Sequence, residues 1–182
     1  MLFRCSAFIA TSVDGFIARD DGALDWLVPE SSNPSEDYGY SSFMSSIDVV
    51  VLGRATFETV LSFGSWPYGD KRVVVLSRSA VTIPKRVGSK VNASSLSPRE
   101  LSSQLAEEGL RHAYIDGGKT IQSFIEQNLI NELTLTQIPV LIGTGIRLFG
   151  AVPKDVHLEL VEVKQFSNGY VQSRYRIKMS NS

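Results

Sequence analysis

Short apolar runs alternate with helical patterns along the first three quarters of the chain. The runs at 47–52 (IDVVVL) and 72–76 (RVVVL) are rich in β-branched residues and lack polar alternation, which is typical of strands covered on both faces. Residues 2–11 and 113–115 have the same apolar character. We therefore predict a sheet that is buried on both sides by helices.

Helical patterns follow several of these runs. Ser97 and Pro98 suit the N-cap and first position of a helix. The spacing of apolar residues predicts a short helix over 36–46, one from near Thr56, one over 98–108, and one that carries Ile121, Phe124, Ile125 and Leu129.

The last third of the chain has a different pattern. Asn168-Gly169 between two long apolar stretches is a strong hairpin signal. Strands that alternate with helices and close with an antiparallel hairpin predict an α/β three-layer domain with a mixed, mostly parallel sheet. The expected segments are a strand at 132–140, a glycine-rich loop at 141–153, and strands at 156–166 and 170–179.

Composition limits the partners. The 182 residues suit one domain over 1–182, and the net charge of -1, from 18 basic and 19 acidic residues, implies no general attraction to nucleic acid or membrane. No apolar run has transmembrane length and the first one lacks a cleavage pattern, so we expect a cytoplasmic protein. Cys5 is the single cysteine, and His112 and His157 have no metal spacing, so we expect no disulfide and no metal site.

Three predicted strands end in residues that suit phosphate groups. Parallel α/β sheets bind ligands at the carboxyl ends of their strands, where helix starts favour anions. Each signal alone also fits a turn or a solvated cation, but three together favour a phosphorylated dinucleotide. The residues are Gly53, Arg54 and Thr56 after the first of these strands, Ser77 and Arg78 after the second, and Gly117, Gly118, Lys119 and Thr120 after the third.

Two common phosphate motifs are absent. A P-loop that ended in Gly118-Lys119-Thr120 would need a glycine at position 113, which is Ala113 and belongs to a predicted strand. The segment GTGIRLFG has the wrong spacing for the dinucleotide fingerprint G-x-G-x-x-G and leads to no predicted helix. Any dinucleotide site here is of another kind.

Four segments resemble the dihydrofolate reductase superfold, and more closely the C-terminal reductase domain of the bifunctional riboflavin-biosynthesis deaminase-reductase. IATSVDGFIA is similar to the family's S-x-D-G-x-I-A turn, and VVVLGRATFE to the G-R-x-T-[WF]-E segment of dihydrofolate reductases. YIDGGKTIQSFIEQNLINELTL resembles the E-G-G helix and the strand after it, and TQIPVLIGTG the family's P-x-x-x-G loop. Their order and spacing agree along nearly the whole chain.

The resemblance implies an NADPH-dependent reductase with a dihydrofolate reductase-like fold, acting on 5-amino-6-(5-phosphoribosylamino)uracil or another small heterocycle. It implies that the cofactor phosphates are met by Gly53, Arg54 and Thr56, and that the 2'-phosphate is held by Ser77 and Arg78. The pyrophosphate would be held by Gly117, Gly118, Lys119 and Thr120. The nicotinamide cleft would be lined by Ala10 and Ile17. It also suggests a homodimer through the C-terminal strands.

The chain departs from the family where substrate is bound. Phe16 replaces the usual lysine, and FETVLSFGSWPYGDKR replaces a segment that carries a substrate-contacting arginine. Trp26 matches a dihydrofolate reductase position, but no unique carboxylate follows it. The substrate-binding candidates are Trp26, Glu36, Asp37 and Thr136, with Glu30 as another carboxylate in the same stretch.

Asp14 is the candidate catalytic residue, as an acid or a substrate anchor, because it lies in the turn that matches the family. The alternative is a turn former before Gly15. Glu36 and Asp37 also suit a charge pair at a helix start. Trp66, Pro67 and Tyr68 form an aromatic segment that either covers a substrate or packs at the solvent edge.

Other functions remain open. A dihydrofolate or pterin reductase, a reductase of another heterocycle or carbonyl, and a nucleotide-binding module without turnover all fit these motifs. A deaminase does not fit, because H-x-E and P-C-x-x-C are both missing from the sequence.

Overall fold

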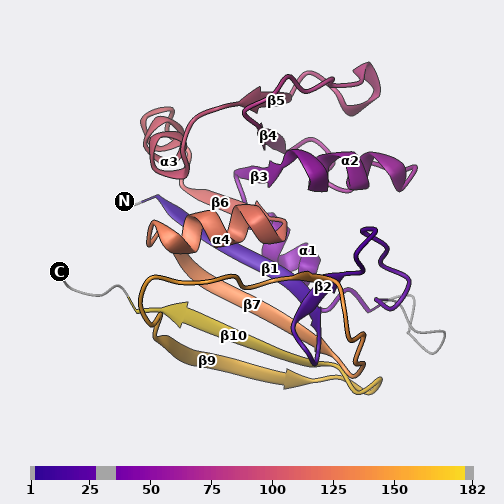
Figure 1. Cartoon of the computed structure of the whole chain (residues 1–182). Coiled ribbons are helices and arrows are strands. Elements are labelled where there is room, and N and C mark those ends of the chain that lie inside the picture. Colours follow the sequence, from indigo (N-terminus) through magenta and orange to yellow (C-terminus); the bar gives the residue numbers. More distant parts are fainter. Residues whose placement is uncertain (1–2, 28–35, 179–182) are drawn as a thin grey trace.

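The computed structural model describes residues 3–27 and 36–178, which form a mixed sheet flanked by helices (Figure 1). Within them, eight strands follow the order β5-β4-β3-β6-β1-β7-β10-β9. They are β1 (Arg4–Ser12), β3 (Val49–Gly53), β4 (Arg72–Leu76), β5 (Val91–Ser94), β6 (His112–Asp116), β7 (Ile130–Ile138), β9 (Leu158–Gln165) and β10 (Val171–Ile177). The helices are α1 (Tyr40–Ser45), α2 (Arg54–Ser62), α3 (Pro98–Glu107) and α4 (Gly118–Glu126), with a 3-10 turn at Lys85–Val87.

The pairing confirms the predicted mixed, mostly parallel sheet. β1 is parallel to both β6 and β7, and β3 is parallel to both β4 and β6. β10 is antiparallel to β7 and to β9, and the turn at Asn168-Gly169 joins the last two strands as predicted. The parallel strands from β4 to β7 therefore present their carboxyl ends along one edge of the sheet.

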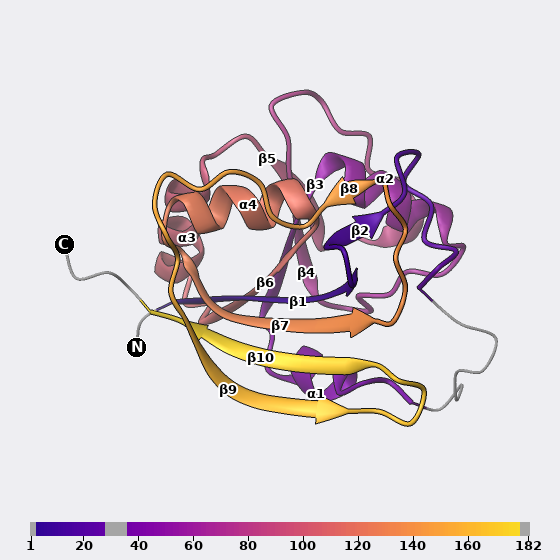
Figure 2. The same cartoon turned by 60° about the horizontal axis from the view of Figure 1, so that its bottom comes forward.

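The sheet has apolar side chains on both faces because its central strands are continuous apolar runs. Val49 and Val51 pack with residues of α3 and α4, whereas Val50 and Leu52 pack with α2 and the aromatic residues of α1. These four side chains are fully buried. Figure 2 shows α4 and α1 on opposite faces of the central strands. The three-layer architecture is thus confirmed.

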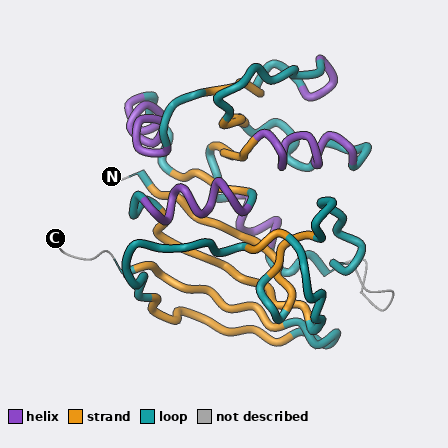
Figure 3. Tube along the Cα trace, in the orientation of Figure 1, coloured by secondary structure: helices purple, strands orange, loops and turns teal. Residues whose placement is uncertain are grey.

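Two local predictions need correction. The helix predicted over 36–46 begins only at Tyr40, because Tyr38 and Gly39 have positive φ angles of 54° and 82°, which are incompatible with a continuing helix. The segment at 141–153, predicted as a loop, contains the short strand β8 (Ile146–Arg147). Most of the chain between β7 and β9 is nonetheless loop (Figure 3).

β8 pairs antiparallel with β2 (Phe16–Ala18), which brings two distant segments together beside the main sheet. Gly145 makes this approach possible, because a Cβ there would lie 2.3 Å from the carbonyl oxygen of Ala18. Asp14 lies in the turn between β1 and β2, and Ile17 is the middle residue of β2.

β9 is one of the two edge strands of the main sheet, and all eight of its residues are exposed, Leu160 and Val163 among them. The homodimer expected through the C-terminal strands stays a prediction. No helix in the described ranges is long and apolar enough to cross a membrane.

Candidate functional site

The three strand ends predicted to bind phosphate are neighbours in the structure. β3 lies between β4 and β6, with Gly53 opposite Leu76 and Leu52 opposite Asp116. α2 begins directly after Gly53, and α4 begins directly after Gly117. The sheet thus gathers the predicted cofactor residues along one edge, here called the glycine edge.

Two glycines let the starts of α2 and α4 pack against each other. A Cβ on Gly117 would lie 2.1 Å from Thr56 Oγ1, and a Cβ on Gly53 would lie 2.8 Å from Thr120 Oγ1. Gly117 also has a φ of 89°, which favours glycine. Each glycine therefore makes room for the threonine of the other helix, so Thr56 and Thr120 have a packing role whether or not they meet a ligand.

The same two helix starts are suited to an anion. Gly53 and Gly117 are their N-caps, and in the described chain no side chain caps either one. The first N–H groups of a helix carry partial positive charge and lack partners within the helix, so they favour phosphate. Lys119 in the first turn of α4 is exposed and adds a cation.

The arginines beside the glycine edge differ in how they are held. Arg54 Nε donates to Glu58 Oε1 at 2.7 Å on the surface of α2. Arg78 is exposed, and no described carboxylate lies within ion-pair distance of it. The preceding Ser77 bonds through its hydroxyl to both the N–H and the carbonyl of Ser79, which shapes the turn after β4. Arg78 is thus available for a phosphate, whereas Arg54 is shared with Glu58.

Asp14 anchors a loop. Its carboxylate accepts from the N–H of Gly143 at 2.8 Å and from that of Ile142 at 3.3 Å. A hydrogen bond from the Ser12 hydroxyl, followed by these two N–H groups, lowers the pKa of Asp14 below its ordinary value. A carboxylate held this way is a poor proton donor, so the geometry suits the anchor more than the acid. Whether Asp14 meets substrate stays a prediction.

Three of the predicted cleft and substrate residues lie close together. Ala10 is paired with Thr136 across β1 and β7, and Trp26 packs beside Ala10. The Thr136 hydroxyl accepts from Gln172 Nε2 at 2.9 Å. Ile17 lies against the start of α4, because a Cβ on Gly118 would be 2.7 Å from Ile17 Cδ1.

One atom of this group has no partner. Trp26 is 8% exposed, and its indole Nε1 is buried without a hydrogen bond in the described structure. An unpartnered buried donor is uncommon in folded proteins.

The other substrate candidates have backbone roles. Asp37 accepts from the N–H groups of Gly39 and Ser41, both at 2.9 Å, and thereby caps the start of α1. Glu36 accepts from the N–H of Tyr38 at 2.9 Å. Both carboxylates are exposed, which supports the helix-start interpretation. Glu30 lies outside the described residues.

Asp116 is a site residue that the sequence reasoning did not select. It is the last residue of β6, directly before Gly117, and it is only partly exposed. Its Oδ2 accepts from the Tyr68 hydroxyl at 2.8 Å, and its Oδ1 accepts from the N–H of Gly117 at 2.8 Å. Burial raises the pKa of Asp116 above its ordinary 3.8. Its position before the paired glycines was the signal available in the sequence.

The aromatic segment after α2 packs inward. Tyr68 is 4% exposed, and its ring meets Trp66 edge to face at 5.1 Å. Trp66 in turn meets Phe57 of α2 at 6.0 Å. Tyr68 and Trp66 therefore pack in the wall beside Asp116, whereas Pro67 between them is exposed.

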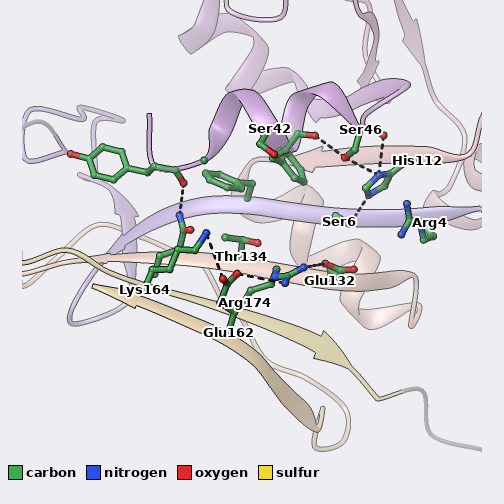
Figure 4. Close-up of a pocket in the computed structure, with 15 residues that line it drawn as sticks. Arg4, Ser6, Ser42, Ser46, His112, Glu132, Thr134, Glu162, Lys164 and Arg174 are labelled. Carbon is green, nitrogen blue, oxygen red and sulfur yellow. Dashed lines mark hydrogen bonds and ion pairs between the residues drawn. The ribbon is translucent and has the colours of Figure 1, made fainter. Parts of the chain in front are cut away.

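A separate hollow of about 380 Å³ lies between α1 and the strands β1, β7, β9 and β10 (Figure 4). His112 lies in its wall and bonds to the hydroxyl of Ser6 at 2.7 Å and to the carbonyl of Ser46 at 3.1 Å. Burial lowers the pKa of His112, which fits a neutral structural residue. The hollow is near the amino ends of β1 and β6, and none of the predicted cofactor residues lines it.

Charged side chains of both signs line this hollow. Arg174 lies 3.7 Å from Glu132 and 3.5 Å from Glu162, and Lys164 lies 3.6 Å from Glu162. No group of three His, Cys, Asp or Glu residues in the described ranges is arranged to hold a metal ion.

Comparison with known proteins now identifies the family. The model of the family described as "RibD C-terminal domain" matches residues 5–172 of this chain. The chain is 34% identical to the uncharacterized protein YwjB of Bacillus subtilis (strain 168), over 92% of this chain and 94% of that protein. It is 35% identical to a crystal structure from Shewanella sp. PV-4 that is named for riboflavin biosynthesis, with a TM-score of 0.92 over 97% of this chain and 100% of that one.

Two more distant proteins are named for riboflavin biosynthesis or for the reductase. The riboflavin biosynthesis protein RibD of Corynebacterium ammoniagenes is 26% identical over 75% of this chain, which corresponds to 43% of that protein. The deaminase/5-amino-6-(5-phosphoribosylamino)uracil reductase of Thermotoga maritima is 16% identical and shares the fold, with a TM-score of 0.73 over 97% of this chain and 57% of that one. The chain thus belongs to the RibD C-terminal domain family, the reductase-like family of riboflavin biosynthesis that its four motifs resemble.

Proposed function

We propose that the protein is an NADPH-dependent reductase of a small heterocyclic substrate, of the 5-amino-6-(5-phosphoribosylamino)uracil reductase type. The family supports a reductase, and a named relative carries that activity in its name. The observation that carries the proposal is the glycine edge, where three adjacent strand ends and two helix starts offer contacts to several phosphates.

The residues at this edge fit the cofactor. A Cβ on Gly117 would collide with Thr56 and one on Gly118 would lie 2.7 Å from Ile17 Cδ1, so glycine at both positions keeps the start of α4 close to its neighbours. The N–H groups in the first turn of α4 and Lys119 would hold the pyrophosphate, while Ser77 and Arg78 would hold the 2'-phosphate. Ala10 and Ile17 would line the nicotinamide end.

The chain also offers a proton source. When bound, NADPH supplies a hydride that adds to the carbon of a C=N or C=O bond and leaves NADP+. The nitrogen or oxygen of that bond must take a proton, and we assign its donation to Asp116, a half-buried carboxyl at the end of β6 whose pKa is raised by burial. Water then restores the proton of the carboxylate. Trp26 and Thr136 would orient the substrate ring.

A cofactor titration tests the proposal. Energy transfer from Trp26 and Trp66 to the nicotinamide reports binding of NADPH and of NADH. We expect NADPH to bind more tightly, and we expect Arg78→Ala to weaken NADPH about tenfold, or about 1.4 kcal/mol, with little effect on NADH. Arg176→Ala, an exposed arginine on β10, is the matched control and should change neither affinity. Failure of both cofactors to bind at millimolar concentration would overturn the assignment.

Turnover separates the remaining alternatives. Reduction of the phosphoribosylamino-pyrimidine supports the riboflavin-type reductase, and reduction of dihydrofolate supports a pterin reductase. Binding of NADPH without reduction of any heterocycle or carbonyl favours a nucleotide-binding module. In that comparison, Asp14→Asn should leave NADPH affinity intact, so any loss of reduction would assign Asp14 to the substrate side.

A further inference from the structure

We infer that Tyr68 is a positioning residue for the reaction proposed above. Its phenol fixes one oxygen of the Asp116 carboxyl and controls how firmly that carboxyl holds its proton. This inference rests on the proposed function, because it assigns the Asp116 proton to the substrate. Tyr68 itself touches neither the substrate nor the glycine edge in this scheme, and it acts through Asp116.

The geometry gives the Asp116 carboxyl one orientation. Tyr68 donates to Oδ2 and the N–H of Gly117 donates to Oδ1, both at 2.8 Å. Each oxygen keeps a further lone pair for a proton or a ligand. Because Gly117 is the N-cap of α4, the same residue ties the carboxyl to the helix start that would hold the cofactor.

The ring of Tyr68 is held in place by the residues that pack around it. It is buried with Phe57, Val60 and the central strand residues, and Trp66 packs edge to face against its ring. A phenol fixed by a packed core loses little freedom when it donates, so the hydrogen bond needs no further ordering. The hydroxyl therefore stays on Asp116 when the carboxyl changes protonation state.

The groups that face Asp116 are phenols. They are Tyr68 from the segment after α2, Tyr114 from β6 itself, and Tyr40 from α1. Tyr114 donates its hydroxyl to the carbonyl of Phe8 at 3.0 Å, and no described cation forms an ion pair with Asp116. Leu52 of β3 is the neighbour on the other strand. With no described cation in ion-pair contact, hydrogen bonds are the means by which the described residues stabilise the carboxylate.

Burial and hydrogen bonding have opposite effects on the pKa of Asp116. Burial raises the pKa of Asp116, and the Tyr68 hydrogen bond is the largest effect that lowers it. The negative charge also acts on the phenols, because the pKa of Tyr40 is raised to about 12 by burial and by Asp116. Removing the Tyr68 hydroxyl should therefore leave Asp116 protonated to a higher pH.

The decisive experiment measures that proton directly. In protein labelled with ¹³C-aspartate, the carboxyl carbon of Asp116 is titrated by NMR and assigned by its absence in Asp116→Asn. In Tyr68→Phe we expect the titration midpoint to move up by about 0.5 to 1 pH unit. Tyr40→Phe is the matched control, a phenol of the same cluster with no described hydrogen bond to Asp116, and should move it much less. An unchanged midpoint in Tyr68→Phe would overturn the inference.

The second readout is the pH profile of reduction, with the phosphoribosylamino-pyrimidine and dihydrofolate as substrates and NADPH as donor. An acid must be protonated to act, so kcat should fall above the Asp116 pKa, and Tyr68→Phe should move that fall to higher pH by the same amount. A shift in the NMR midpoint without a shift in the profile would overturn the role in catalysis. If no substrate is reduced by the wild type, the proposed function fails, and the NMR titration alone decides whether Tyr68 controls the Asp116 proton.

Discussion

Two Asp-Gly pairs occur beside neighbouring central strands, and they have opposite electrostatic properties. Asp14 lies just after β1 and accepts two backbone N–H groups from the loop at 142–143, which lowers its pKa together with the Ser12 hydroxyl. Asp116 ends β6 among tyrosines, and burial raises its pKa. The same dipeptide thus gives a carboxyl with a lowered pKa in one turn and a carboxyl with a raised pKa in the other.

The glycines of the two pairs also differ, in the space that is available around them. Gly15 and Gly117 both have positive φ angles, 85° and 89°. A Cβ on Gly15 would meet nothing within 4 Å, whereas one on Gly117 would collide with Thr56. The turn at Asp14 therefore needs glycine for its conformation alone, and the turn at Asp116 needs it also for helix packing.

The largest expected effect is on kcat, for which the two carboxyls should differ in importance. If the reductase proposal holds, Asp116→Asn should lower kcat by about 10²- to 10³-fold, since general acids contribute on that order. Asp14→Asn should change kcat only modestly. Steady-state kinetics with NADPH measures both, and a larger loss in Asp14→Asn would reverse the assignment of the acid.

The second effect concerns the glycines. Gly117→Ala should destabilise the fold by about 3 kcal/mol or more, because backbone strain costs about 1–2 kcal/mol and overpacking adds about 1–3 kcal/mol. Gly15→Ala should cost only the strain, about 1–2 kcal/mol. Urea unfolding of the two variants gives the difference, and equal losses would show that the contact with Thr56 relaxes freely.

The third effect is a pH dependence of stability. The folded state binds the Asp116 proton more tightly than the unfolded chain, so this group reduces stability as pH rises from about 3.8 through its raised pKa. The stability of Asp116→Asn relative to wild type should therefore improve with rising pH. Unfolding free energies at several pH values test the sign, and a relative loss for the variant at high pH would contradict a raised pKa.

The smallest expected effect is the pH dependence of stability that Asp14 produces. Its pKa is lowered from the ordinary 3.8, so its contribution to stability is complete above that value and is lost as pH falls through the lowered pKa. Wild type should lose more stability than Asp14→Asn in this acidic range. Thermal melts between neutral pH and pH 3 provide the measurement, with Asp20→Asn as an exposed control.

Much of the fold could be predicted because its signals are local. The apolar runs at 47–52 and 72–76 became β3 and β4, and the Asn168-Gly169 turn joins β9 and β10. α3 begins with a full capping box, in which Ser97 and Glu100 each accept from the backbone of the other. In each case a few adjacent residues determine the element.

The failures involve partners far apart in the sequence. Ile146 and Arg147 lack a strand pattern of their own, and they are extended because they pair with Phe16–Ala18. The bond between Tyr68 and Asp116 spans 48 positions, so neither residue reveals it. Thr56 was selected for a phosphate, but its contact with Gly117 depends on two helices meeting. Sequence motifs therefore predict the glycine edge more readily than they predict the side chains that pack behind that edge.

The position of β1 has a consequence for synthesis on the ribosome. β1 is made first, yet both of its neighbours in the sheet, β6 and β7, lie between residues 112 and 138. Until those strands emerge, the apolar side chains of β1 have no partner and both of its edges are open, a state prone to aggregation. Nascent chains that pause before residue 112 are therefore expected to bind chaperones strongly, and soluble yield should improve when residues 112–138 are translated quickly.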